Sequence, residues 1–209
     1  ALQYLHCENN RLTSLDVSGR TKLRELLCDD NKLTSLNISG CMLLRQFWCN
    51  NNRLTSLNVS DRAELSQFLC DNNQLASLTI NGCVALKDFR CENNLLTSLD
   101  VSRFTVLDYL SCYDNKLTSL KVKGCVALSN INCSNNQLTA LDVSGLIALK
   151  TLTMDNNPQL ALLDANGCTA LTRFDCSGNQ LVSLNVSGCT ALKELICNYN
   201  QLTELNVSG

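Results

Sequence analysis

The sequence contains almost no proline or histidine and few aromatic residues. Pro158 is the only proline and His6 the only histidine among 209 residues, and aromatic residues make up 5% of the chain. A single histidine leaves little material for general acid–base catalysis. No apolar run approaches the roughly 20 residues that a membrane-spanning helix needs. We therefore predict a chain that does not span a membrane.

The sequence also lacks an excess of charge of either sign. Lys and Arg number 17 against 19 Asp and Glu, which gives a formal net charge of −2. The basic residues are scattered and form no cluster, which argues against a nucleic-acid-binding surface. There is no linker, charge block or low-complexity tract, so nothing in the composition divides the chain into separate domains.

A 21-residue repeat occupies the whole chain. Residues 44–54 read Leu-x-x-Phe-x-Cys-x-x-Asn-x-Leu, which matches the leucine-rich-repeat pattern except that Cys49 replaces a strand leucine. The period is constant apart from one 22-residue step, from Leu149 to Leu171. The ten frames begin at Leu2, Leu23, Leu44, Leu65, Leu86, Leu107, Leu128, Leu149, Leu171 and Leu192.

Three slots of the frame have a physical explanation. Apolar residues two apart share one face of a short strand, so we expect the strand slot and the thiol slot to point inward. The strand slot holds Leu5, Leu26, Phe47, Phe68, Phe89, Leu110, Ile131, Leu152, Phe174 and Leu195. The thiol slot holds Cys7, Cys28, Cys49, Cys70, Cys91, Cys112, Cys133, Met154, Cys176 and Cys197. The third slot is asparagine in all ten frames, where its amide can satisfy backbone groups that leave the sheet.

The second half of each frame is rich in Thr, Ser and Val and has no helical period. Leu54, Leu57 and Val59 mark its inward positions, and the glycine after the serine closes the coil with a positive φ. Asp61 and Arg103 interrupt this glycine pattern, and Asp tolerates positive φ better than Arg. We predict extended or 3₁₀ segments here and no α-helix.

The repeat predicts a right-handed leucine-rich-repeat solenoid with a parallel β-sheet on its concave face. One coil cannot bury its own apolar side, but stacked coils make a continuous core. We expect residues 1–209 to form a single domain of ten 21-residue repeats, with one 22-residue repeat at 149–170 and the last repeat truncated. Neither end has an atypical capping repeat, so we expect a fragment of a longer protein. The inserted Pro158 should bulge outward; a slight bend of the solenoid is one interpretation, and neutral drift in a loop is the favoured one.

The 14 cysteines predict buried free thiols rather than a disulfide framework. Parallel neighbours point their Cβ atoms the same way, which is poor geometry for a bridge. No C-x-x-C spacing occurs, so we expect no metal or iron–sulfur site and no cofactor. Five further cysteines follow the turn glycine. Of these, only Cys168 and Cys189 fall in adjacent coils and form a candidate pair.

The frame resembles the leucine-rich-repeat region of internalin J and related bacterial surface proteins. The resemblance covers residues 2–209 and rests on the 21-residue period, the strand cysteine and the Leu-Thr-Ser-Leu-Asp-Val-Ser run. It implies a secreted or wall-attached bacterial protein that binds host or matrix molecules through its concave sheet. The family's helical cap, Ig-like domain and wall anchor are not in this sequence. Bacterial ubiquitin-ligase effectors carry paired Leu-Pro motifs, which one proline does not supply.

Three variable columns should face outward from the sheet. The first runs from Tyr4 to Glu194 through Gln46 and Gln67; the second from His6 to Ile196; the third from Glu8 to Asn198. The second column places an apolar run in a polar surrounding, which marks an interaction site. The candidate partner-binding residues are Leu27, Trp48, Leu69 and Arg90, with Tyr109 and Tyr113 as a second candidate.

Other chemistries have weaker support. His6 lies beside Glu8 and Tyr4 on an open sheet with no nucleophile facing the same way, so we predict no enzyme. The acids Glu8, Asp29, Asp71 and Glu92 could collect calcium, but a flat column offers fewer than the six to eight oxygens calcium prefers. A solvated acidic edge is the alternative.

We therefore predict a non-enzymatic adhesion module that binds a protein partner, with a glycan possible, at the cell surface or outside the cell. A structural spacer that presents another domain is the alternative.

Overall fold

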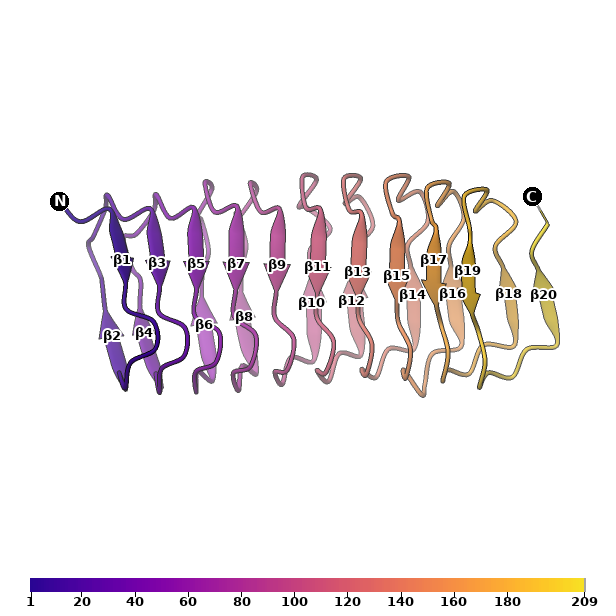
Figure 1. The fold of residues 1–209 in the computed structure, drawn as a ribbon, viewed down its shortest axis with the longest axis horizontal. Helices are drawn as coiled ribbons and strands as arrows, with labels where there is room; N and C mark the ends of the chain where they lie inside the picture. Colours follow the sequence, from indigo (N-terminus) through magenta and orange to yellow (C-terminus); the bar gives the residue numbers. More distant parts are fainter. Residues whose placement is uncertain (209) are drawn as a thin grey trace. The chain divides into compact units, whose positions relative to one another are not determined.

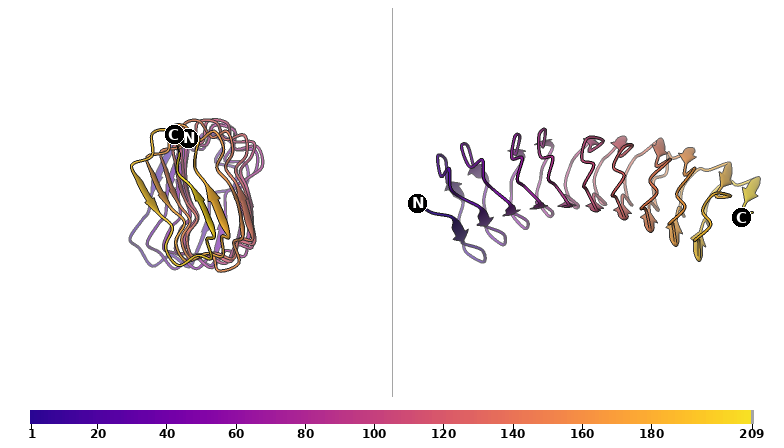
Figure 2. Two further views of the ribbon diagram at one scale, coloured as in Figure 1. Left: turned by 90° about the vertical axis from the view of Figure 1, so that its right-hand side faces the viewer. Right: turned by 90° about the horizontal axis from the view of Figure 1, so that it is seen from above.

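The computed structural model describes residues 1–208. The chain divides into two compact units, Ala1–Leu96 and a second unit that begins at Thr97. The prediction that residues 1–209 form a single domain stays a prediction. In each unit the chain winds through successive coils that carry one short strand on either side (Figures 1 and 2).

The odd-numbered strands of each unit pair in parallel, with each residue aligned to the same slot of the next coil. In the first unit they are β1 (Tyr4–His6), β3 (Glu25–Leu27), β5 (Gln46–Trp48), β7 (Gln67–Leu69) and β9 (Asp88–Arg90). In the second unit they are β11 (Tyr109–Ser111), β13 (Asn130–Asn132), β15 (Thr151–Thr153), β17 (Arg173–Asp175) and β19 (Glu194–Ile196). The predicted parallel sheet is confirmed.

The even-numbered strands lie on the other side of the coils, where they form separate parallel pairs. In the first unit these are β2 (Ser14–Asp16) with β4 (Ser35–Asn37), and β6 (Ser56–Asn58) with β8 (Ser77–Thr79). In the second unit they are β10 (Ser98–Asp100) with β12 (Ser119–Lys121), β14 (Ala140–Asp142) with β16 (Leu162–Asp164), and β18 (Ser183–Asn185) with β20 (Glu204–Asn206). The prediction of extended segments in the second half of each frame is confirmed. Residues 1–208 contain neither 3₁₀ nor α-helical turns.

The core of each coil is filled from the slots that the repeat predicts. In the third coil Leu44, Phe47, Cys49, Leu54 and Val59 are all 0–1% exposed. In the odd strands the central residue points inward while its two neighbours point outward, as the two-residue period of a strand requires. Burial of one apolar set per coil joins the coils into a continuous core.

The conserved asparagines form a ladder of backbone hydrogen bonds. The Nδ2 of Asn52 donates to the carbonyls of Cys28 (3.0 Å), Cys49 (3.1 Å) and Asn50 (3.2 Å). Its Oδ1 accepts from the amide of Leu33 at 2.9 Å. One side chain therefore ties its own coil to the preceding one and satisfies carbonyls that leave the sheet.

Most coils contain two turns with a left-handed backbone. Gly19 (φ 70°) and Gly40 (φ 79°) confirm the predicted positive φ after the serine, and Asp61 adopts the same conformation with φ 64°. Arg103 and Gly188 occupy the same slot without a positive φ. A second left-handed position, which the repeat pattern did not predict, lies one residue before the ladder asparagine. Asn51 (φ 53°) and Asp30 (φ 52°) hold it, and the preference of Asn and Asp for this region explains the Asn-Asn and Asp-Asn pairs.

The slot after the turn glycine alternates between cysteine and a larger residue. It holds Arg20, Cys41, Arg62, Cys83, Phe104, Cys125, Leu146, Cys168 and Cys189. Each of its cysteine thiols points at a backbone carbonyl of the preceding coil, as when Cys41 Sγ donates to the Val17 carbonyl at 3.1 Å. Arg62 is only 7% exposed and fills the equivalent place, with one terminal nitrogen donating to the Ile38 carbonyl at 2.9 Å.

The inserted residue of the 22-residue coil is absorbed in a turn after Asn157. The amide of Leu160 donates to the Asn157 carbonyl at 2.8 Å, and Leu160 is buried. The next strand regains the frame, because Ala140 in β14 pairs with Leu162 in β16. Leu162 itself is 69% exposed. The predicted bend of the solenoid stays a prediction.

Candidate functional site

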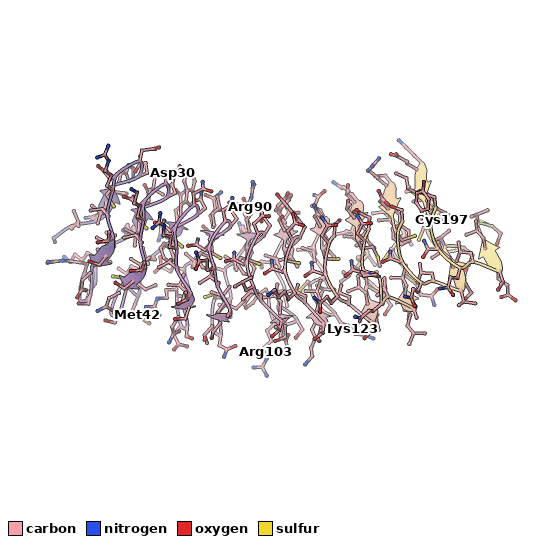
Figure 3. All side chains as sticks on the ribbon, turned by 90° about the horizontal axis from the view of Figure 1, so that it is seen from below. Asp30, Met42, Arg90, Arg103, Lys123 and Cys197 are labelled. Atoms are coloured by element: carbon pink, nitrogen blue, oxygen red, sulfur yellow. The ribbon has the colours of Figure 1, made fainter. Side chains whose placement is uncertain are left out.

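The candidate residues of the first unit lie in one row across the outward face of its odd strands. In the parallel register, Leu27 aligns with Trp48, Trp48 with Leu69, and Leu69 with Arg90. All four side chains are half-buried. Figure 3 labels Arg90 on this face and Met42 on the opposite side of the coils. We call Leu27, Trp48 and Leu69 the apolar row.

A hydrogen-bonded chain fixes the orientation of Trp48. Its indole Nε1 donates to Gln67 Oε1 at 3.2 Å, and Gln67 Nε2 donates in turn to Asp88 Oδ2 at 3.2 Å. Asp88 receives two hydrogen bonds from the Arg90 guanidinium, from Nε at 3.0 Å and from a terminal nitrogen at 3.1 Å. The polar edge of the indole is therefore satisfied within the face, which leaves its ring for apolar contact.

A stack of phenylalanines lies on the core side of the same strands. The ring centroids of Phe47 and Phe68 are 5.3 Å apart, and those of Phe68 and Phe89 are 5.5 Å apart. The rings are nearly parallel, with interplanar angles of 14° and 6°. All three side chains are fully buried. The apolar row is therefore supported by a packed core, which favours a preformed surface.

Polar and acidic residues follow the strands along one edge of the apolar row. Glu8, Asp29, Asn50 and Asp71 occupy the same slot of successive coils, and backbone hydrogen bonds such as that from the Asp30 amide to the Asn50 carbonyl (3.1 Å) join them. Burial raises the pKa of the Asp29 and Asp71 carboxyls. Glu8 Oε2, Asp29 Oδ1 and Asn50 Oδ1 are buried and accept no hydrogen bond. We call these four residues the acidic edge.

The second candidate, Tyr109 with Tyr113, lies in the other unit. Tyr109 begins β11, and Tyr113 follows that strand. Both side chains are half-buried, and Ser111 between them is only 2% exposed. The alignment of Tyr109 with Asn130 and of Ser111 with Asn132 gives these tyrosines polar neighbours instead of an apolar row.

The residues that could take part in catalysis or metal binding lie apart from one another. His6 lies within 3.2 Å of Glu25 Oε2 on the open face. The thiols of Cys28, Cys49 and Cys70 are buried beneath that face, and burial raises their pKa values above the ordinary range. Among residues 1–208 no three His, Cys, Asp or Glu side chains gather as a metal ion requires.

All 14 cysteines are free thiols, as the sequence analysis predicts. Cys168 and Cys189 are both buried and reduced, and each thiol points at a different backbone carbonyl of the coil before it, Val143 and Ala165 respectively. Burial raises the pKa of Cys168 to about 11, with the Cys189 thiol a smaller cause. The candidate pair is therefore two separate thiols in this structure.

Sequence reasoning missed Gln67 and Asp88 as part of the site. Both occupy the first outward column. Gln67 reaches across coils to Trp48 on one side and Asp88 on the other, and Asp88 bonds Arg90 within its own strand β9. Their slots hold varied residues from coil to coil, so the period alone gives no signal for them. A glutamine 19 residues after the only tryptophan is the signal that could have been used.

Comparisons with known proteins agree with this architecture. No family model matches the chain, and no curated protein matches it. A solved structure of the functional domain of InlJ from Listeria monocytogenes, described as including a cysteine ladder, is 32% identical with a TM-score of 0.65. The match covers 99% of this chain and 55% of the InlJ structure. This chain is a cysteine-ladder leucine-rich-repeat solenoid.

A second similar structure extends the comparison of the solenoid. YopM, a leucine-rich effector protein from Yersinia pestis, has a TM-score of 0.69 and 22% identity, over 98% of this chain and 71% of YopM. At that identity YopM supports the fold alone. The solenoid spans about half of the InlJ structure, and no helix within residues 1–208 is long and apolar enough to cross a membrane.

Proposed function

We propose that the solenoid is a protein-binding module that engages its partner through the outward face of β3, β5 and β7. The observation that supports this is the apolar row, in which Leu27, Trp48 and Leu69 align across three neighbouring coils. Apolar surface rimmed by polar groups favours association, and tryptophan is a frequent anchor of binding energy. This is the face that the repeat frame predicts to be concave.

The proposal extends to a surface or secreted bacterial protein that binds a host or matrix protein. The similarity to the functional domain of InlJ supports this setting. The mechanism is presentation of a preformed surface: the Gln67 contact and the phenylalanine stack hold the row in place, so little ordering entropy is lost on binding. The role is binding rather than catalysis, because the face carries one histidine and no thiol nucleophile.

Binding of the labelled solenoid to host cells and to purified matrix proteins tests the proposal. The variant Trp48→Ala/Leu69→Ala should bind at least about tenfold more weakly, because it truncates two of the three apolar side chains of the row, including the tryptophan. A matched control, Val126→Ala/Ile147→Ala, truncates two exposed apolar residues that lie in turns of the second unit. It should bind as the unmodified chain does. Circular dichroism checks that both variants stay folded.

The other outcomes of this experiment are informative. Equal binding by the unmodified chain and the Trp48→Ala/Leu69→Ala variant would place the contact elsewhere. Absence of binding by any of the three chains, across a broad panel, would favour the structural spacer.

A further inference from the structure

The sheet face around Trp48 is acidic as well as apolar. Six carboxylates occupy its three outward columns in the first unit: Glu8, Glu25, Asp29, Asp71, Asp88 and Glu92. The only permanent cation in those columns is Arg90, and it is already bonded to Asp88. The face therefore has a large negative excess, although the whole chain has a net charge of only −2.

Three of the four residues of the acidic edge have a buried side-chain oxygen that accepts no hydrogen bond. Backbone bonds join the coils at this edge, from the amide of Asn9 to the carbonyl of Asp29 at 3.1 Å, and from that of Asn51 to Asp71 at 3.0 Å. Stacked coils repeat at about the strand spacing of 4.8 Å, so each acid has another polar group close beside it. An oxygen of Glu8, Asp29 and Asn50 has no hydrogen-bond donor, which is unfavourable for buried acceptors.

Two kinds of surface therefore run side by side along the same coils. The apolar row offers the indole face of Trp48 between two leucines, and the acidic edge offers carboxylates within two residues of it in sequence. A lysine or arginine side chain matches both, because its aliphatic stem packs on apolar surface while its cationic head bonds to carboxylates. Tryptophan also attracts cations over its ring.

We propose that this face binds a basic polypeptide segment, with apolar residues on the Leu27–Trp48–Leu69 row and lysine or arginine heads on the acidic edge. The inference rests on the proposed function and adds the chemistry of the partner. Acidic partners, including anionic glycans, are disfavoured because they would bring like charges together at close range. Within residues 1–208 no three His, Cys, Asp or Glu side chains lie close enough together to hold a metal ion, so the acids of this face are not arranged as a metal site.

The only tryptophan of the chain provides a direct probe of this face. The fluorescence of Trp48 should be titrated with two short acetylated peptides, one alternating lysine and leucine, the other alternating glutamate and leucine. The lysine peptide should produce a saturable change and the glutamate peptide should not. Equal affinity for the two peptides would overturn the proposal.

A pair of charge variants tests the acidic edge. Asp29→Asn/Asp71→Asn gives both slots the residue that Asn50 already provides, so the fold should be kept. Its affinity for the lysine peptide should fall by about tenfold. The control Asp16→Asn/Asp100→Asn changes the charge equally in β2 and β10, in a slot that also holds Asn37 and Asn58. It should bind as the unmodified chain does, and a loss of the same size in both variants would overturn the proposal.

The results separate this inference from the proposed function. If the cell and matrix panel reveals a partner that depends on Trp48 while the lysine peptide fails to bind, the binding function stands and the basic partner is overturned. If the lysine peptide binds in a manner that depends on Asp29 and Asp71 while no panel partner depends on Trp48, the inference stands and the proposed use of the apolar row fails.

Discussion

Asp71 and Asn50 occupy the same slot on neighbouring coils and differ at neutral pH mainly in charge. Burial raises the pKa of the Asp71 carboxyl because its charged form loses hydration. The folded protein therefore holds this proton more tightly than the unfolded chain does. The resulting destabilisation is absent below the unfolded pKa, grows as the pH rises between the two pKa values, and is complete above the folded one.

Substitution of Asp71 by asparagine should therefore stabilise the first unit at neutral pH. We expect a gain of about 0.5 kcal/mol, kept small because the half-exposed side chain is screened by solvent. Urea denaturation at pH 7 measures the gain, and it should vanish at a pH below the ordinary range of aspartate. A gain of equal size at both pH values would mean that the carboxyl charge is not its cause.

Among the elements of the fold, the asparagine ladder connects each coil to the one before it. Asn52 bonds three carbonyls and one amide, and most of these hydrogen bonds are buried. Asn10, at the first coil, is exposed and donates only to the carbonyls of Cys7 and Glu8 within its own coil. The two asparagines thus separate the ladder contribution from the local turn.

Replacement of Asn52 by alanine should cost about 3 kcal/mol or more, because several buried backbone groups lose a hydrogen bond at once. Replacement of Asn10 by alanine should cost less than about 1 kcal/mol, since water can replace its partners. Chemical denaturation of the two variants measures both values. Equal losses at the two positions would contradict a role of the ladder in joining coils.

The sequence predicts most of the coil, because each slot is set by a local two-residue period and by stacking on an equivalent slot. Phe47 and Cys49 turn inward as expected, and the register of Trp48 with Leu69 follows from the constant repeat. The contacts of Gln67 with Trp48 and Asp88 could not be predicted, because they depend on the rotamers that extended side chains adopt between neighbouring coils. The left-handed turn at Asn51 has a local cause, and its pattern was present in the sequence.

At the scale of the whole molecule, the thiols are almost all shielded from water. Of the 14 free cysteines, 12 are buried, and only Cys7 and Cys197, in the first and last frames, are partly exposed. Burial raises the pKa of Cys133 and Cys176 to about 12 each. Since the thiolate is the reactive form, the buried thiols should be inert while the coils stay stacked.

Native alkylation should therefore modify Cys7 and Cys197 well before the others. We expect iodoacetamide at mildly alkaline pH to add at most two groups quickly, and the remaining 12 only as the chain unfolds in denaturant. Intact-mass spectrometry counts the groups, and peptide mapping locates them. Rapid native modification of most cysteines would show that the coils open far more readily than the packed core implies.

The alternation in the slot after the turn glycine bears on the ancestry of the chain. Cys41, Cys83 and Cys125 lie in every second coil, and each intervening coil carries a larger residue in that slot. Repeated copying of a single coil would place the same residue in this slot of every coil and would not produce this alternation. Duplication of coil pairs accounts for it, and Cys168 followed at once by Cys189 marks the end of that series.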